Sequence, residues 1–285
     1  MAVYNSGKYL KEAIVSMLSQ TFRDFEFIII NDGSTDNSLE ILRSFSDTRI
    51  KIINHDHKGL SASLNIGLQV AEGEYIARMD ADDISNPERL EKQFKFMTEN
   101  KECVLSGSNI QLMKEDGTIL ITTKIKTNWE DIKLDLFNIQ LPHPTAMYKK
   151  DIALKCGGYF EKIKHHFEDI ILWNKMAEFG EIRNLEDVLL KYRLTRESIS
   201  NKSKQQQEII NLICGNVIRQ GMITEEDLLK LERITLPRSG SWKSSNYYYT
   251  LAMIYRSEKN FTQALLNYWK AFSHNPQQCI FQILN

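Results

Sequence analysis

Short apolar runs alternate with amphipathic stretches over the first hundred residues of the chain. Three runs rich in β-branched and aromatic residues predict buried strands: 25–30 (FEFIII), 49–53 (RIKII) and 73–79 (GEYIARM). The stretches between them predict helices over about 38–45 and 60–72, and Pro87 opens a further helix. This alternation predicts an α/β domain with a mixed, mainly parallel sheet flanked by helices.

The first residues break this alternation. The chain opens with MAVYNSGKYLKEA, a loop that runs into a helix with Ala13, Val15, Met17 and Leu18 as its apolar positions. In an alternating α/β chain, a strand should lead into such a loop. We therefore expect a first strand that is truncated here and a natural reading frame that begins upstream. That strand would lie beside 25–30, and its loss would open a groove in the core.

The pattern changes after residue 100. Further strands are predicted at 103–107 (CVLSG), 118–125 (TILITTKI) and 143–150 (HPTAMYKK). A helix begins near Glu168, with an apolar stripe made by Ile170, Ile171, Trp173, Met176 and Ala177. From about residue 204 the whole chain is predicted to be helical. A soft boundary near 200–205 predicts a catalytic domain over 1–204 and a helical region over 205–285.

The helical region carries a repeat-like pattern at about 246–276. Aromatic, small and proline residues recur at the spacing of one tetratricopeptide repeat: Tyr248, Leu251, Ala252, Tyr255, Phe261, Ala264, Tyr268, Ala271 and Pro276. The small residues would let two antiparallel helices approach closely. A single repeat does not form an independent solenoid, so a hairpin that packs on the catalytic domain or on a protein partner is expected. A generic helical tail is the alternative.

Composition narrows the class of protein. Hydrophobic residues make up 42% of the chain and charged residues 26%, as in ordinary globular proteins. The formal net charge of −1 argues against nucleic-acid binding, which needs a basic surface. Four cysteines without CxxC spacing argue against a zinc site and fit a reducing compartment. With no apolar run long enough to span a bilayer, we expect a cytoplasmic protein, with peripheral contact at a membrane as an open option.

The most informative stretch is RMDADD at residues 78–83. Its carboxylates follow an apolar strand and repel one another, so a positive charge should offset them. Alternation along an extended segment points Asp80 and Asp82 to the same side, where they could hold Mg²⁺ or Mn²⁺. The alternative is a solvated acidic turn in which Asp83 caps the next helix.

A series of motifs in order places this stretch in a wider context. The motifs are VYN (3–5), NDGSTDNS (31–38), KGLSASLNIGLQVAEGEYIARMDADD (58–83), NPERLEKQ (86–93), HPTAM (143–147), GGY (157–159), EDIILW (168–173) and YRLTRESIS (192–200). Together they resemble family 2 glycosyltransferases over about residues 1–200. The resemblance implies the GT-A fold, a Rossmann-like fold, and an inverting transfer of sugar from a nucleotide donor.

The resemblance implies a nucleotide site in the N-terminal motifs. Tyr4, flanked by Val3 and Asn5, matches the aromatic residue that stacks on the base. Asp32 matches the carboxylate that hydrogen-bonds the pyrimidine ring, although a turn residue of this type is also common. Lys58 matches a basic residue near the nucleotide, and a solvated lysine is nearly as good an interpretation.

The resemblance also assigns the acidic stretch and the EDIILW motif. Asp80 matches a ribose or metal contact and Asp82 the principal metal ligand, while Arg78 is either a nucleotide contact or structural. Asp169 matches the catalytic base and Glu168 its acidic neighbour. Both precede a helix whose dipole favours the ionised carboxylate, although carboxylates are common at helix starts. A base is needed because the acceptor hydroxyl must lose its proton as it attacks.

Three residues have weaker assignments. Trp173 could form the floor of an acceptor pocket or belong to the core, and His143 could contact acceptor or phosphate or be structural. In YRLTRESIS this chain has Thr195 where the family frequently has a histidine. Arg193 or Arg196 could then supply the positive charge, or metal ligation could be weaker.

These features predict a metal-dependent glycosyltransferase. We expect a nucleoside-diphosphate sugar as donor, with a UDP-sugar as first candidate, and a glycan or lipid-linked acceptor. The family suggests bacterial surface polysaccharide synthesis (lipopolysaccharide, O-antigen or capsule) at the inner face of the membrane. A nucleotidyltransferase is the runner-up, although no Gly-rich basic loop is present. An inactive scaffold that binds a partner through its C-terminal helices is the third alternative.

Overall fold

The computed structural model describes residues 1–162, 167–196, 204–235 and 240–284. Contacts divide the chain into two compact units. The first unit contains residues 1–111 and 122–192, and the second contains 112–121 together with the chain from Arg193 onward. The expected boundary at 200–205 lies partly outside the described residues, so the proposed division at 204/205 stays a prediction.

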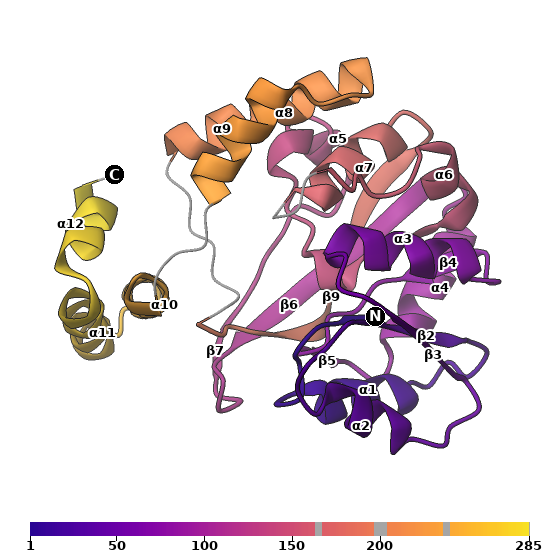
Figure 1. Cartoon of the computed structure of the whole chain (residues 1–285), viewed down its shortest axis with the longest axis horizontal. Helices are drawn as coiled ribbons and strands as arrows, with labels where there is room; N and C mark the ends of the chain where they lie inside the picture. The colour runs from indigo at the N-terminus through magenta and orange to yellow at the C-terminus, as the bar shows by residue number, and fades with distance from the viewer. Residues whose placement is uncertain (163–166, 197–203, 236–239, 285) are drawn as a thin grey trace. The chain divides into compact units, whose positions relative to one another are not determined.

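The first sheet of the first unit is parallel. It has the order β1 (Ala2–Val3), β2 (Phe27–Asp32) and β3 (Ile50–His55). Figure 1 labels β2 and β3. Val3 pairs with Asn31, and Asp32 pairs with His55. The strands predicted at 25–30 and 49–53 are thus confirmed, and their carboxyl ends meet at one edge.

Helices cover both sides of this sheet. In Figure 1, α3 (Leu60–Val70) lies above β2 and β3, and α1 (Leu10–Leu18) and α2 (Ser38–Arg43) lie below. These helices confirm the predicted ones. One detail of the prediction was wrong: Ile14 and not Val15 is buried in α1, because the helix presents Leu10, Ala13, Ile14 and Met17 to the sheet.

The second sheet of the unit is built largely from antiparallel pairs. Its strands are β4 (Tyr75–Ala77), β5 (Ile84–Ser85), β6 (Cys103–Met113), β7 (Ile119–Thr122), β8 (Met147–Lys149) and β9 (Glu181–Arg193). The order is β4-β8-β6-β9-β5, and β7 pairs with β6. The pairs β4·β8, β6·β8 and β5·β9 are antiparallel, so the sheets are mixed and the parallel part is the first sheet. The long strand β9 was not predicted.

The helices of this region are short apart from α4 and α7. They are α4 (Arg89–Glu99), α5 (Trp129–Ile132), α6 (Lys150–Lys155) and α7 (Glu168–Met176), with 3₁₀ turns η1 (Leu136–Asn138) and η2 (His143–Thr145). Trp173 of α7 lies at the centre of a buried cluster with Leu105, Tyr148, Tyr159 and Ile182. This cluster fixes α7 against the second sheet and thereby positions its first turn.

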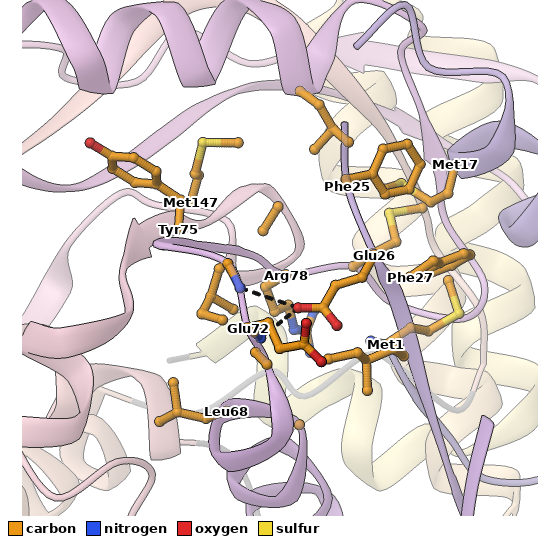
Figure 2. Close-up of a pocket in the computed structure, with 18 of the residues that line it drawn as sticks. Met1, Met17, Phe25, Glu26, Phe27, Leu68, Glu72, Tyr75, Arg78 and Met147 are labelled. Carbon is orange, nitrogen blue, oxygen red and sulfur yellow. Dashed lines mark hydrogen bonds between the residues drawn. The ribbon is translucent and has the colours of Figure 1, made fainter. Parts of the chain in front are cut away.

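A cavity of about 530 Å³ separates the two sheets where β2 and β4 both contribute to its wall. Its lining is mainly apolar, and Figure 2 shows Met1, Phe27, Leu68 and Tyr75 around it. Phe27, Ile28 and Ile30 of β2 line one side of this cavity.

The second unit is mainly helical. Its helices are α8 (Lys204–Gln220), α9 (Glu225–Thr235), α10 (Gly240–Ser257), α11 (Phe261–His274) and α12 (Pro276–Leu284). The predicted pair α10–α11 is present, and Ala252, Ala264 and Ala271 are buried where the helices meet. Its tetratricopeptide-like nature remains a proposal. Among the described residues, no helix is both long and apolar enough to span a bilayer.

Candidate active site

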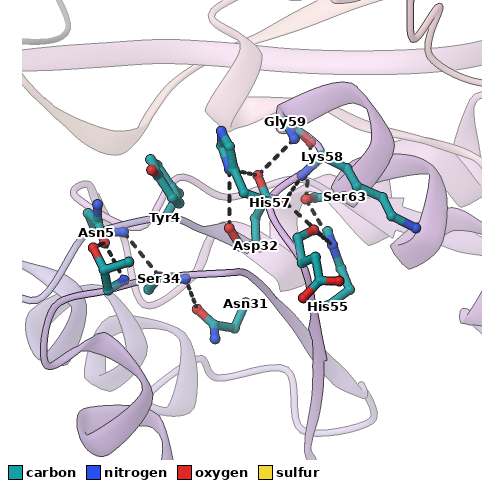
Figure 3. A network of polar contacts seen from close by, with 12 residues as sticks. Tyr4, Asn5, Asn31, Asp32, Ser34, His55, His57, Lys58, Gly59 and Ser63 are labelled. Carbon is teal, nitrogen blue, oxygen red and sulfur yellow. Dashed lines mark hydrogen bonds and ion pairs between the residues drawn. The ribbon is translucent and has the colours of Figure 1, made fainter.

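Asp32 lies at the carboxyl end of β2 and faces the start of α3. Its carboxylate accepts hydrogen bonds from the backbone N–H groups of Lys58 (2.7 Å) and Gly59 (3.0 Å), as Figure 3 shows. The first N–H groups of a helix have no partner within the helix, so they are natural donors to a carboxylate. Asp32 is therefore held rigidly at the edge of the sheet.

Two histidines that the sequence analysis did not single out flank Asp32. The Nδ1 atom of His57 lies 3.0 Å from Oδ2 of Asp32, and that of His55 lies 3.5 Å from Oδ1. The ring of His57 also stacks on Tyr4, with centroids 4.0 Å apart and planes inclined by 23°. The ring of Tyr4 remains about half exposed. Tyr4 and Asp32, predicted to bind a base, therefore meet at one site with His57 between them (Figure 3).

The other residues predicted to bind nucleotide have different positions. Val3 is fully buried in β1, so its side chain belongs to the core. Asn5 accepts a hydrogen bond from the Thr35 N–H (2.8 Å) and shapes the loop after β2. Lys58 contributes its backbone N–H to Asp32, and Figure 3 shows its side chain pointing away from Tyr4. Only backbone groups of Lys58 therefore act on this site in the described structure.

An acidic group follows β4. Carboxylate oxygens of Asp80, Asp82 and Asp83 lie within 4.8 Å of one another. Asp83 does not cap α4, whose N-cap is Glu88, so the capping alternative was wrong. Three hard oxygen donors at this separation suit Mg²⁺ or Mn²⁺, which bind carboxylates and keep other positions for water and phosphate. The donor set therefore fits the implied metal.

Arg78 is the buried counter-charge of this acidic group. Its guanidinium forms an ion pair with Asp80, and the side chain is 5% exposed. Burial alone would lower the pKa of Arg78, but the adjacent Asp80 carboxylate outweighs it and raises the pKa. The backbone fixes the position of Arg78, because its N–H donates to the Ala146 carbonyl (2.8 Å) and its carbonyl accepts from the buried Arg89 (2.6 Å).

Tyr192 at the end of β9 faces the same acidic group. Burial, then the charges of Asp83, Asp80 and Asp82, raise the pKa of its hydroxyl, which therefore stays protonated. The antiparallel pairing of β5 with β9 brings this residue beside a stretch more than a hundred positions earlier. Tyr192 is the first residue of the YRLTRESIS motif, and no role was predicted for it.

Two carboxylates lie in the first turn of α7. Glu168 is buried and its Oε2 accepts from the Phe167 N–H (3.0 Å), whereas Asp169 is partly exposed. Burial, followed by repulsion from Glu168, raises the pKa of Asp169 to about 7. A carboxyl with a pKa near neutrality can exchange a proton with a substrate hydroxyl at physiological pH. Asp169 thus has the environment of a general base.

His143 contacts this pair from η2. Its Nδ1 lies 3.6 Å from Oε1 of Glu168, and its Nε2 lies 3.2 Å from the Tyr159 hydroxyl. Burial, then the charge of Arg78, lowers the pKa of His143 well below its usual value. The ring is therefore neutral at pH 7, so a role as a cationic phosphate contact is disfavoured. Its position beside Glu168 favours instead a role in holding that carboxylate in place.

Trp173 and Arg193 are both buried. Trp173 is fully buried between His143 and Tyr148, so its indole forms part of the core and not the floor of an acceptor pocket. Arg193 belongs to the second unit, where its Nη1 donates to the Glu115 carbonyl (3.1 Å). This contact favours a structural role. Residues 197–200 of the YRLTRESIS motif lie outside the described residues.

Comparisons with known proteins identify the family. The model of "Glycosyl transferase family 2" matches residues 1–153, more than half of the chain. An O-antigen biosynthesis glycosyltransferase of Escherichia coli, WbnJ, is 36% identical over 228 residues, which cover 76% of this chain and 84% of that protein. An uncharacterized glycosyltransferase of Methanocaldococcus jannaschii is 38% identical over 216 residues, which cover 73% and 74% of the two chains.

Solved structures share the fold at low sequence identity. TarS 1–349 of S. aureus in complex with UDP has a TM-score of 0.60 at 16% identity, covering 96% of this chain and 90% of that one. A mannosyltransferase of Pyrobaculum calidifontis in complex with GDP-Man and Mn²⁺ has a TM-score of 0.57 at 14% identity, covering 99% and 83%. Taken together, the family match and the two relatives show that this chain belongs to glycosyl transferase family 2 and has a GT-A-like fold.

Proposed function

We propose that this glycosyltransferase is an inverting, metal-dependent enzyme. It would transfer a sugar from a nucleoside-diphosphate donor, first of all a UDP-sugar, to a hydroxyl of a glycan or lipid-linked acceptor. One observation carries the proposal. Arg78 forms an ion pair with Asp80 and also acts electrostatically on Glu168 and Asp169.

The position of Arg78 supports a shared reaction centre. Electrostatic coupling requires short distances, so the acidic group after β4 and the first turn of α7 lie close together around this guanidinium. One group would serve the leaving diphosphate and the other the attacking hydroxyl. An in-line displacement needs these functions on two sides of the same anomeric carbon, and it leads to inversion.

The proposed donor site begins at Tyr4 and Asp32. The exposed face of Tyr4 offers a stacking surface, and Asp32 offers a hydrogen-bond acceptor for a base N–H. The complexes of the fold neighbours with UDP and with GDP-Man and Mn²⁺ support a nucleotide-sugar donor, although they leave the nucleotide open. UDP is the first candidate because a pyrimidine N–H would match the single acceptor group of Asp32.

The chain's own side chains would perform the proton transfer. Asp169 would accept the proton of the acceptor hydroxyl, since its raised pKa makes it a stronger base than an ordinary carboxylate. Glu168, held by the Phe167 N–H and close to His143, would sustain that pKa by like-charge repulsion. Asp80, Asp82 and Asp83 would hold Mn²⁺ or Mg²⁺, which stabilises negative charge on the leaving diphosphate when bound.

We propose bacterial surface polysaccharide synthesis as the biological setting. WbnJ is named as an O-antigen biosynthesis glycosyltransferase, which supports this setting. A lipid-linked acceptor would be met at the cytoplasmic face of a membrane. Phe261, Leu265 and Trp269 recur at helical spacing and expose about two thirds of their surface on one side of α11, which could rest on that face.

The test is donor binding followed by transfer. Thermal shift with UDP, GDP and dTDP, each with and without Mn²⁺, should show a metal-dependent rise for UDP. A donor screen should then show sugar release that Asp169→Asn abolishes while UDP binding is kept. Nucleotide exchange with pyrophosphate as product would favour the nucleotidyltransferase alternative. Absence of any nucleotide response from folded protein would favour the scaffold.

A further inference from the structure

The second unit contains a cavity of about 280 Å³ that the proposed reaction does not use. It lies between the turn after β6, at Lys114–Asp116, and the pair α10–α11. Tyrosine, amide, basic and acidic side chains line it, including Tyr248, Tyr255, Gln263 and Asn267. Its volume lies just below the roughly 300–1,000 Å³ typical of small-ligand sites. Every residue that lines it belongs to the second unit.

Two cations converge on one aromatic ring in this cavity. The Arg196 guanidinium carbon lies 5.8 Å from the centroid of Tyr248, and its Nη2 donates to the Tyr248 hydroxyl (3.2 Å). The Lys270 ammonium lies 5.4 Å from the same centroid. Both positive charges thus lie within 6 Å of the same ring although Arg196 and Lys270 are far apart in sequence.

The lining carries three basic side chains, Lys114, Arg196 and Lys270, and two carboxylates, Glu115 and Asp116. Within the described ranges, neither the guanidinium of Arg196 nor the ammonium of Lys270 has a carboxylate at ion-pair distance. The Glu115 carboxylate accepts a hydrogen bond from the backbone N–H of Arg196 (3.4 Å). The third basic side chain, Lys114, lies 3.8 Å from Asp116. Three cations against two carboxylates leave the lining with an excess of positive charge, which favours binding of an anion, since charge-assisted hydrogen bonds are the strong ones.

The rest of the lining suits a sugar ring. Tyrosine faces provide apolar surface with a polar hydroxyl, which matches the mixed surface of a pyranose. Asn267 is buried and its side chain donates to the Gln263 carbonyl (2.8 Å), which fixes its amide at the wall. Gln263 lies exposed at the rim, where its amide could reach a sugar hydroxyl. A simple anion would need none of these groups.

We propose that this cavity binds an anionic saccharide, a pyranose unit that carries a phosphate or a carboxylate group. The anionic group lies between Arg196 and Lys270, and the ring lies against the tyrosines. As a segment of the glycan acceptor, this saccharide would hold the growing polymer to the enzyme. Only that use rests on the proposed function, since binding itself needs no transfer.

The test measures equilibrium binding to the full chain by calorimetry or NMR. The probes are glucose 1-phosphate, glucuronic acid, glucose and inorganic phosphate. We expect one of the two anionic sugars to bind at least about tenfold more tightly than glucose or inorganic phosphate, and the better one identifies the anionic group. Equal binding of inorganic phosphate and glucose 1-phosphate, or no binding of either anionic sugar, would overturn the proposal.

Substitutions test whether the saccharide binds in this cavity. Arg196→Gln and Lys270→Gln should each weaken binding about tenfold, whereas the matched changes Arg256→Gln and Lys259→Gln, at cations that do not line the cavity, should not. Gln263→Ala, an exposed change that the fold tolerates, should weaken sugar binding by about two- to fivefold. If the cavity variants and the control variants weaken saccharide binding equally, the proposal that the saccharide binds in this cavity is wrong.

UDP and Mn²⁺ binding measured on the same samples separates the two proposals. If UDP binds and no anionic sugar does, the saccharide site is wrong and the proposed function stands. If the sugar binds in the cavity but no nucleotide binds, the proposed function is wrong and the saccharide site stands.

Discussion

The imidazole of His57 lies between Tyr4 and Asp32, stacked on the tyrosine ring at 4.0 Å with its Nδ1 3.0 Å from the carboxylate. A nucleobase that stacks on Tyr4 and donates an N–H to Asp32 would make the same two contacts. His57 therefore occupies, in this structure, the position that we propose for the base. A nucleotide would have to displace it or bind the opposite face of Tyr4.

His57→Ala should raise UDP affinity. Removing the imidazole frees the tyrosine face and one carboxylate oxygen, and an aromatic pair contributes about 1 kcal/mol, which corresponds to about fivefold in Kd. Calorimetric titration with UDP and Mn²⁺ measures the change. The matched control is His274→Ala, because His274 also stacks on a tyrosine, Tyr248, at 5.3 Å. A weaker UDP affinity in His57→Ala would mean that the histidine binds the nucleotide instead.

Asp169 should give the enzyme an acidic limb in its pH profile. The base must be ionised, and its pKa is raised to about 7 by burial and by Glu168, so kcat/KM should fall as pH decreases through 7. Glu168→Gln removes the repulsion and should move this limb to lower pH by about one unit. The measurement is donor turnover from pH 5 to 9 with saturating Mn²⁺. An unchanged limb in Glu168→Gln would contradict the assigned coupling.

Asp169→Asn should stabilise the fold at alkaline pH. A carboxyl whose pKa is raised in the folded protein binds a proton there that the unfolded chain has released, so stability falls as pH rises from about 4 through 7. Asparagine does not ionise, so the variant does not lose stability in this pH range. We expect a higher Tm than wild type at pH 8 and a smaller difference at pH 4, measured by differential scanning fluorimetry. A lower Tm than wild type at both pH 8 and pH 4 would contradict the predicted loss of stability on ionisation of Asp169.

Asp83 should either bind the metal directly or hold the carboxylates of Asp80 and Asp82 in position to bind it. Its carboxylate lies within 4.8 Å of those of Asp80 and Asp82, and its side chain is 1% exposed. Asp83→Asn should weaken Mn²⁺ binding at least about tenfold, as should Asp82→Asn. Electron paramagnetic resonance of free Mn²⁺ gives the affinity, with the exposed-helix variant Glu99→Gln as control. Retained Mn²⁺ affinity in Asp83→Asn would leave the site to Asp80 and Asp82.

Arg78→Met should destabilise the protein strongly. Removing one partner of a buried ion pair leaves the other charge uncompensated, and this costs about 3 kcal/mol. Urea unfolding at pH 7.5 measures the loss, and Mn²⁺ should restore part of it by replacing the positive charge. Arg49→Met, which removes an arginine that pairs with Asp47 away from the acidic group, is the control for the metal effect. Equal Mn²⁺ rescue of both variants would contradict the role of Arg78.

Local sequence predicted the parts of the site that follow strands. Asp32 and the acidic stretch both come directly after apolar runs. Asp32 follows a strand of the parallel sheet, whose carboxyl end is the binding edge. The acidic stretch follows β4, which pairs antiparallel with β8. The first turn of α7 was predicted for a similar reason, since Asp169 precedes an apolar stripe. The residues in these positions could be assigned without knowledge of their neighbours.

Residues brought in by tertiary pairing escaped the sequence analysis. Strand β9 mixes charged residues with apolar ones because Asn184 and Arg193 are buried with hydrogen bonds, so its alternation is masked and Tyr192 had no predicted place. His57 lies in a polar loop whose contact with Tyr4 depends on the register of β2 and β3. The place of Trp173 could not be predicted for a different reason. An apolar stripe on a helix has the same sequence pattern whether it faces the core or a substrate pocket.

The pocket of about 530 Å³ between β2 and β4 has a consequence for the stability of the protein. Its wall is mainly apolar and it is open to solvent, so the water inside it makes few hydrogen bonds to the protein. A small apolar molecule that replaces this water would bind the folded chain and not the unfolded one. Its binding should therefore raise the Tm of the protein.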